Sequence, residues 1–261
     1  IDAAKGIEAQ TRKLFEVCRL RDIPIMTFIN KMDREARDPF ELIDEIADQL
    51  QLECIPMNWP SESGLNFRGV FDLRSQEFLP FKQPGMRVPA NEIANSLAEA
   101  ECTKLNEDVS LIEGASTPFD LATYREGHQT PVYFGSALKK YGVLELLRGL
   151  VDFAPSPRTQ HAVPHDVSPA DEGVTGFVFK VQANMDPNHR DRVAFLRLCS
   201  GRFRRGMKLK QSGTGKVIGV HNPILFFAQS RETVDEAYPG DIIGIPNHGV
   251  LRVGDTLSES E

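Results

Sequence analysis

A continuous apolar run at residues 23–29, IPIMTFI, limits the folds that this chain can adopt. It has the length of a strand and lacks the alternation of a half-exposed one, which is typical of a parallel strand covered on both faces. Helix signals follow, because Asp38 can cap a helix that starts at Pro39, and apolar residues then repeat at helical spacing. A short strand at 53–56 completes a strand, helix, strand order, which predicts a doubly wound α/β layer.

The α/β pattern is interrupted by about seventy residues and then resumes. Residues 58–129 are punctuated by Pro and Gly, and we interpret them as a subdomain inserted into a first domain of residues 1–155. The elements expected around and within it are an amphipathic helix at 7–20, a hairpin at 69–78, a polar helix at 90–112, a strand at 130–135 and an amphipathic helix at 143–151.

The C-terminal part of the chain has a different composition. Residues 156–172 hold several prolines and no apolar periodicity, which predicts a linker. Residues 173–261 consist of short alternating runs separated by Gly-rich turns, which favours a small antiparallel β-barrel. The strands expected there lie at 175–181, 193–199, 207–210, 216–220, 241–245 and 251–257.

Composition excludes several classes of protein. With 261 residues, of which 41% are hydrophobic and 26% charged, the chain has ordinary globular composition and the length of one or two domains. No stretch approaches the roughly 20 apolar residues that span a bilayer. A net charge of -7 argues against DNA as a partner and against bulk electrostatic binding of nucleic acid. We expect a cytoplasmic protein with four reduced cysteines, Cys18, Cys54, Cys102 and Cys199.

Polar residues directly after the first predicted strand carry the strongest chemical signal. Asn30, Lys31 and Asp33 stand in the sequence NKMD, at the edge where open α/β sheets bind ligands. A carboxylate can accept both the ring N–H and the exocyclic amine of guanine, an asparagine can brace the loop and reach the base edge, and a lysine stem can lie along the base. Adenine has no matching pair of donors, so one carboxylate can select the base. Taken alone, the motif is also compatible with an ordinary polar loop.

A second loop strengthens the nucleotide interpretation. Ser136, Ala137 and Leu138 follow the next core strand, and we expect this loop to bring backbone N–H groups towards the carbonyl oxygen of the same base. Two matched loops on consecutive core strands therefore favour a guanine site over an ordinary polar loop.

With both loops in place, the chain resembles the translational GTPases, whose base-recognition loops are N-K-x-D and S-A-[KL]. The resemblance covers nearly the whole chain. It implies the C-terminal half of a P-loop-type GTPase domain with an inserted subdomain, followed by the β-barrel that forms domain II of translation factors. Stretches at 66–73, 182–192 and 238–244 resemble the branch of this family that promotes the departure of class-one release factors in translation termination. The resemblance implies GTP or GDP with Mg²⁺ as ligands of the parent protein, and the ribosome and class-one release factors as its partners.

The hydrolytic part of the family pattern is not found in the sequence. No stretch matches G-x-x-x-x-G-K-[ST], which holds the phosphates and Mg²⁺. The lookalike at 213–216 is followed by Val217 and is better explained as a hairpin turn, and the D-x-x-G lookalike at 241–244 lies in the β part. Ile1 and Asp2 resemble the tail of a buried strand, so we expect a partial chain. Such a chain should have no catalytic residue, no metal site, no tight nucleotide binding and no GTP hydrolysis of its own.

Residues 190–216 form a local basic stretch, with nine Lys or Arg against one acid. A solvated strand face is one explanation. The family resemblance favours contact with ribosomal RNA phosphates, because domain II of such factors faces the small subunit. The residues expected to make that contact are Arg197, Arg202, Arg204, Arg205, Lys208 and Lys210.

Two alternatives to a termination factor stay open at this point. A GTPase similar to elongation factor G or to the ribosomal-protection proteins shares the same loops, and a non-enzymatic ribosome-binding module needs only the barrel and a degenerate GTPase domain.

Other candidate sites have simpler explanations. His161 and His165 lie in the linker without a third metal ligand, and Trp59 is expected to be a packing residue.

Overall fold

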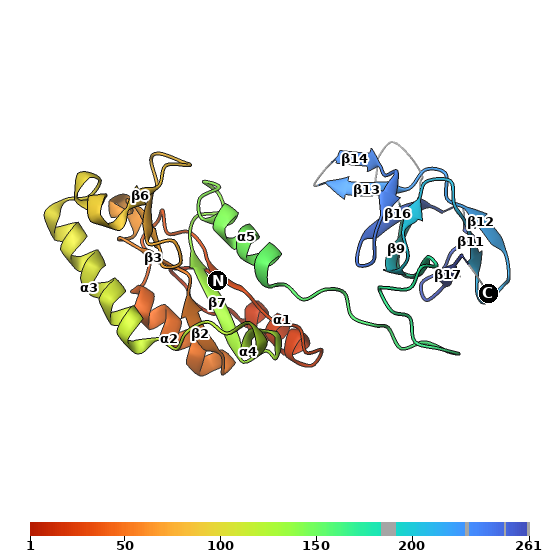
Figure 1. Ribbon diagram of the computed structural model, residues 1–261, viewed down its shortest axis with the longest axis horizontal. Coiled ribbons are helices and arrows are strands. Elements are labelled where there is room, and N and C mark those ends of the chain that lie inside the picture. The colour runs from red at the N-terminus through yellow and green to blue at the C-terminus, as the bar shows by residue number, and fades with distance from the viewer. Residues whose placement is uncertain (184–191, 228–229, 248, 260–261) are drawn as a thin grey trace. The chain divides into compact units, whose positions relative to one another are not determined.

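The computed structural model describes residues 1–183, 192–227, 230–247 and 249–259 (Figure 1). Most of the turn-rich stretch at 182–192, used above for the termination branch, lies outside these residues. The chain divides into two compact units, Ile1–Pro155 and Ser156–Glu261, and each has its own hydrophobic core. No helix in the described ranges is long and apolar enough to cross a membrane.

A parallel sheet forms the centre of the first unit. Its order is β1-β7-β2, and the strands are β1 (Thr27–Ile29), β7 (Gln129–Phe134) and β2 (Glu53–Pro56). The predicted strand at 23–29 is therefore a strand only over its last three residues. Pro24 explains part of the difference, because proline has no N–H to donate to a neighbouring strand.

The first residues of the chain lie beside β1. The N–H of Asn30 donates to the carbonyl of Ile1, and the N–H of Ala3 donates to the carbonyl of Asn30, as in a parallel strand pair. The expectation that Ile1 and Asp2 form the end of a strand agrees with this pairing. Residues 1–3 thus bring the Asp2 side chain to the same sheet edge as Asn30.

Three helices accompany this sheet at the positions that apolar periodicity predicts. The second of them begins as expected, because the carboxylate of Asp38 accepts the N–H groups of Phe40 and Glu41. Its buried residues Leu42 and Ile46 belong to the main core of the unit. The helices are α1 (Ala9–Arg19), α2 (Pro39–Leu50) and α5 (Val143–Phe153).

The insertion forms its own antiparallel sheet of order β3-β4-β5-β6, with α3 running alongside it (Figure 1). The expected hairpin is the β4–β5 pair. The expected polar helix starts later than predicted, at Glu99, because the Glu101 carboxylate accepts the N–H of Ala98 and fixes the helix start there. The elements are β3 (Asn58–Pro60), η1 (Gly64–Asn66), β4 (Gly69–Asp72), β5 (Glu77–Pro80), β6 (Val88–Pro89), η2 (Ala90–Asn95), α3 (Glu99–Ala115) and α4 (Leu121–Arg125).

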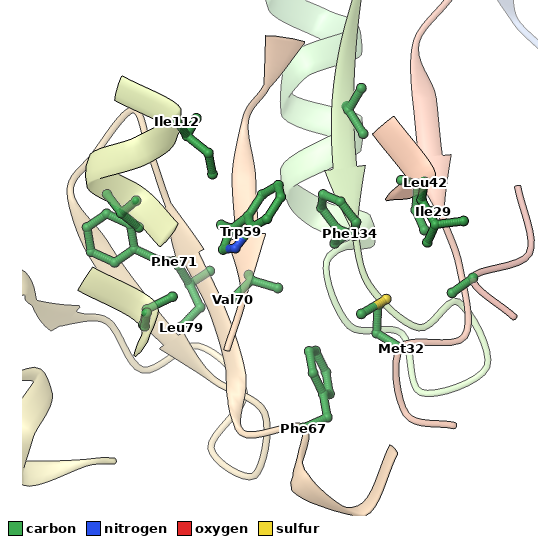
Figure 2. Packing of buried hydrophobic residues seen from close by; sticks show 14 of the residues in the cluster. Ile29, Met32, Leu42, Trp59, Phe67, Val70, Phe71, Leu79, Ile112 and Phe134 are labelled. Carbon is green, nitrogen blue, oxygen red and sulfur yellow. The ribbon is translucent and has the colours of Figure 1, made fainter. Parts of the chain in front are cut away.

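One hydrophobic cluster joins the insertion to the parallel sheet. Trp59 on β3 is fully buried, its ring centroid lies 5.3 Å from that of Phe134 on β7, and its indole N–H donates to Asp108 on α3 at 3.2 Å. Figure 2 shows this pair together with Val70 of the inserted sheet and Ile29 of the parallel sheet. Trp59 is therefore a packing residue, as predicted, and the insertion is part of the first unit's core.

The second unit is a curled antiparallel sheet whose described strands follow the order β12-β11-β17-β8-β9-β16-β13-β14. The pairing of β8 with β9 shifts register between Val178 and Lys180, and such a bulge increases the curl of a strand pair. The predicted barrel is thus an open half-barrel. Its strands are β8 (Thr175–Ala183), β9 (Arg192–Ser200), β11 (Lys208–Gln211), β12 (Val217–Gly219), β13 (Ile224–Phe227), β14 (Ser230–Thr233), β16 (Ile242–Pro246) and β17 (Thr256–Ser258).

A separate strand pair completes this unit, β10 (Phe203–Arg204) with β15 (Glu236–Ala237). The predictions missed it, as they missed β13 and β14, and most of the strand expected at 251–257 is a turn that precedes β17. The phosphate-loop lookalike is a hairpin turn, as predicted, since β11 and β12 pair around it and the Gln211 N–H donates to the Lys216 carbonyl.

Candidate functional site

Asn30 connects the two predicted base-recognition loops. It follows β1 directly, and its side-chain Oδ1 accepts the backbone N–H of Lys31 at 2.8 Å and the backbone N–H of Ala137 at 2.8 Å. The second bond crosses from β1 to the loop after β7, the neighbouring strand. Two segments that lie 107 residues apart in sequence are therefore fixed side by side at the carboxyl edge of the sheet.

Two polar groups of the first loop have no partner in the described parts of the chain. The partly exposed Asp33 carboxylate makes no hydrogen bond or ion pair with a described residue, and neither does the side-chain NH₂ group of Asn30. The first is an open acceptor and the second an open donor. The loop thus presents both kinds of group that recognition of a base edge requires.

Lys31 is held by an acid that the sequence analysis did not single out as a site residue. Its backbone is left-handed, at φ +76°, and its ammonium group donates to Asp2 Oδ2 at 2.6 Å. This hydrogen bond lowers the pKa of Asp2, whose side chain is only 10% exposed. The sequence signal that could have placed Asp2 beside β1 was the strand-like character of Ile1 and Asp2, which pair with the end of β1.

The second loop is closed on itself. Ser136 and Tyr141 exchange both backbone hydrogen bonds, and the fully buried Ser136 side chain accepts the N–H of Lys139 at 3.4 Å. The Ala137 N–H already donates to the Asn30 side-chain oxygen. Within the described residues, the N–H of Leu138 has no acceptor, so it is the open backbone donor of this loop. Ser136 therefore shapes the loop, and Leu138 offers its backbone to a ligand while its side chain is 75% exposed.

Asn58 of the insertion supports the strand that leads into this loop. Its side chain is buried, its NH₂ group donates to the Phe134 carbonyl at 3.1 Å, and its Oδ1 accepts the Phe134 N–H at 2.7 Å. The side chain thus replaces a neighbouring strand where β2 has ended. Gly135 follows, and a Cβ there would lie 2.4 Å from the Tyr141 carbonyl oxygen, so only glycine allows this close approach.

The two loops contain no cluster of metal-ligating side chains in the described part of the chain. Among the residues that the structure describes, no group of three or more His, Cys, Asp or Glu is placed to hold a metal. The Lys31 ammonium is engaged with Asp2.

The basic residues that the structure describes in the second unit lie on several strands, and some are paired with acids. Arg204 lies on β10 and Arg202 directly before it. The Arg202 Nε donates to the Glu236 carboxylate, and another oxygen of that carboxylate lies 3.8 Å from the Arg204 Nε. Arg205 lies 3.6 Å from an Asp235 oxygen. Acids from a distant part of the sequence thus neutralise part of the charge.

The remaining basic residues lie on other strands. Arg197 is half-buried on β9, which is three strands away from β11 in the sheet order. Lys208 and Lys210 lie on β11. Arg190 lies outside the described residues.

Comparison with known proteins places each unit in a family. Residues 1–156 match the family described as elongation factor Tu GTP binding domain, and residues 173–260 match elongation factor G domain 2. A crystal structure of a protein from Thermus thermophilus resembles the whole chain at a TM-score of 0.72 and 22% sequence identity. That similarity covers 100% of this chain and 40% of the solved chain, so our chain spans less than half of its length.

The first family model matches well over half of the chain, and the second matches the half-barrel that follows it. The chain therefore belongs to the translational GTPase family, as a GTPase domain of the elongation factor Tu type followed by domain 2 of the elongation factor G type.

Proposed function

We propose that the two loops at the carboxyl edge of β1 and β7 bind the guanine base of GTP or GDP. The observation that carries this proposal is the geometry of Asn30, which joins both loops through Oδ1 while its own NH₂ group and the Asp33 carboxylate stay open to a ligand among the described residues. Each open group has a complement on guanine.

The complementarity can be written atom by atom. The Asp33 carboxylate accepts the N1–H and the 2-amine of guanine, the Asn30 amide donates to N7, and the Leu138 N–H donates to O6. The Lys31 stem, fixed by Asp2 at its end, lies along the ring. Adenine would place an amine against the Leu138 donor and offer Asp33 no N–H. A buried polar group left unpaired costs about 1–3 kcal/mol, so mismatches of this kind discriminate strongly.

A titration with fluorescent nucleoside diphosphates tests the base assignment. We expect GDP to bind better than ADP, and Asp33→Asn to weaken GDP by at least tenfold. Because the asparagine amide can donate to the 2-carbonyl of xanthine, the same variant should bind xanthosine diphosphate better than the unchanged chain does. Equal affinity of Asp33→Asn and the unchanged chain for GDP would overturn the assignment.

We further propose that the parent protein is a bacterial peptide-chain release factor three. In this role it binds GTP with Mg²⁺ on the ribosome in the cytoplasm, promotes the departure of class-one release factors after peptide release, and is reset by GTP hydrolysis. The support is the sequence resemblance at 66–73, 182–192 and 238–244. Ribosomal RNA phosphates would contact the basic residues around β10 and β11.

Competition for ribosomes distinguishes a termination factor from the alternatives. This chain should compete with the complete parent protein on post-termination ribosomes, and the parent should accelerate the departure of a labelled class-one factor. Acceleration of tRNA translocation instead would identify a protein similar to elongation factor G. Binding without any GTP-dependent step would identify a docking module.

A further inference from the structure

Both base-recognition loops are in contact with the insertion. The carbonyl of Met32, in the NKMD loop, accepts the N–H of Gly64 at the start of η1, at 3.0 Å. The second loop ends at Tyr141, whose side chain reaches into the inserted sheet. Figure 2 shows Met32 and Phe67 on the same side of the shared core, one from each side of this junction.

The Tyr141 hydroxyl links two strands of the inserted sheet to the loop. It accepts the backbone N–H of Val70 on β4 at 2.9 Å and donates to the carbonyl of Leu79 on β5. Val70 and Leu79 are direct partners in the β4–β5 register. One side chain therefore satisfies backbone groups on both strands of the hairpin.

Aromatic packing fixes the same ring. Its centroid lies 5.6 Å from that of Phe67 and 5.1 Å from that of Phe81, both in edge-on geometry. The backbone of Tyr141 meanwhile exchanges two hydrogen bonds with Ser136. Tyr141 thus belongs to the loop by its backbone and to the insertion by its side chain.

The contact with the first loop also depends on a special backbone. Gly64 has φ +63°, where side chains are disfavoured, and a Cβ there would lie 3.4 Å from the backbone nitrogen of Glu35. Met32 is fully buried, and its N–H donates to the carbonyl of Gly135 at 3.1 Å. Gly64 therefore supports the NKMD loop at the point where that loop meets the second one.

We propose that the insertion holds the two base-recognition loops in position, and that Tyr141 is the positioning residue through which it acts on the second loop. The inference rests on the proposed guanine site for its functional meaning. The positioning role itself does not require nucleotide, because the order of the loop around Ala137 depends on hydrogen bonds that Tyr141 makes inside the inserted sheet. Loss of the Tyr141 hydroxyl should then loosen the loop and weaken guanine binding.

Amide hydrogen exchange of the nucleotide-free chain tests the positioning role directly. In Tyr141→Phe, the Val70 N–H loses its acceptor, and we expect both Val70 and Ala137 to exchange at least tenfold faster. The Val132 amide in the middle of β7 should keep its rate. Faster exchange at Val70 with an unchanged rate at Ala137 would overturn the proposal, and so would an equal acceleration at Val132, which marks a general loss of stability.

Tyr133→Phe is the matched control. Tyr133 is a buried tyrosine on β7, and its hydroxyl donates to no residue in the described ranges. Its removal should leave the Ala137 rate unchanged. Gly64→Ala is a second variant, which should accelerate the Met32 amide by disturbing the other contact, and an unchanged Met32 rate would count against the insertion as a support for the first loop.

Nucleotide titration separates this inference from the proposed function. If the unchanged chain binds GDP, Tyr141→Phe should weaken it about tenfold and Tyr133→Phe should not. An unchanged GDP affinity in Tyr141→Phe would overturn the functional part of the inference. If the unchanged chain binds neither GDP nor ADP, the proposed function fails for this chain, whereas the exchange rates still decide whether the insertion positions the loops.

Discussion

The side-chain oxygen of Asn30 accepts the backbone N–H of Ala137 at 2.8 Å, although the two residues are 107 positions apart. The same oxygen accepts the N–H of Lys31. This leaves the NH₂ group of Asn30 available to a ligand. The oxygen thus holds the two loops together, and under the proposed function the nitrogen is the group that would contact the base.

Substitutions of Asn30 should separate these two tasks. Asn30→Asp keeps an acceptor for both N–H groups and loses the donor, so the Ala137 amide should keep its protection from exchange while GDP binding falls about tenfold. Asn30→Ala removes both functions and should also accelerate exchange at Ala137. Amide exchange and GDP titration on the two variants check this prediction. A fast Ala137 amide in Asn30→Asp would show that the bond across the loops depends on more than an acceptor.

The 261-residue chain should not hydrolyse GTP above a blank. Under the proposed function its loops would contact the base, but no sequence in the chain matches the phosphate-binding pattern that positions the phosphates and Mg²⁺ for phosphoryl transfer. Release of phosphate from GTP by the purified chain is the measurement, with Asp33→Asn as the control for contaminating GTPases. Turnover that disappears in Asp33→Asn would contradict the prediction, because it would have to come from this site.

Ribosome binding should respond in opposite directions to changes at the two ends of the Arg204–Glu236 pair. Reversing the charges of Arg204 and Arg205 should weaken binding and make the slope of log K against log salt shallower, by about one for each phosphate that is no longer neutralised. Glu236→Gln should strengthen binding, because it frees Arg202 and Arg204 from a neutralising carboxylate. Sedimentation with ribosomes at several salt concentrations measures both effects. Identical slopes in all variants would exclude a phosphate contact here.

The sequence was sufficient for features that depend on local patterns. The helix start at Asp38 depends on a capping side chain and Pro39, both of which are adjacent in sequence. The turn between β11 and β12 likewise follows from its two glycines. The positions of the two base-recognition loops follow from the apolar strands that precede them.

The remaining features depend on contacts between distant residues. Glu236 neutralises arginines more than thirty positions away, so counting acids within 190–216 overestimated the free basic charge. Asn58 and Tyr141 each act through backbone groups of another segment, and no pattern near them indicates that role. β13 and β14 were missed because neither alternates: β13 is a continuous apolar run, ILFF, and β14 is a polar one, SRET. β15 has only two residues.

Asn58→Ala should destabilise the first unit by about 2–4 kcal/mol. The substitution leaves the buried N–H and carbonyl of Phe134 without hydrogen-bond partners, and each unpaired buried group costs about 1–3 kcal/mol. Urea unfolding followed by far-UV circular dichroism measures the change. Asn106→Ala is the control, because Asn106 is exposed on α3 and its side chain contacts only the Cys102 sulfur among the described residues. An effect no larger than that of the control would show that water or a local shift replaces both bonds.

The stability of the first unit should fall in acid partly because of Glu45. Its carboxylate accepts the N–H of Ile7 at 3.0 Å and pairs with Arg37, and these contacts hold the pKa of Glu45 below its usual value. Since the folded pKa is the lower one, the stabilisation is complete above the unfolded pKa of about 4.3 and is lost as the pH falls through the folded pKa. Glu45→Gln should therefore be less stable than the unchanged chain at pH 7, and the difference should shrink below about pH 4. Glu41→Gln is the matched control, because Glu41 lies on the same helix, reaches the same arginine only at 3.9 Å, and is 66% exposed. Urea midpoints between about pH 7 and pH 3 measure the trend, and a difference that stays constant over this range would show that Glu45 contributes through packing and not through its charge.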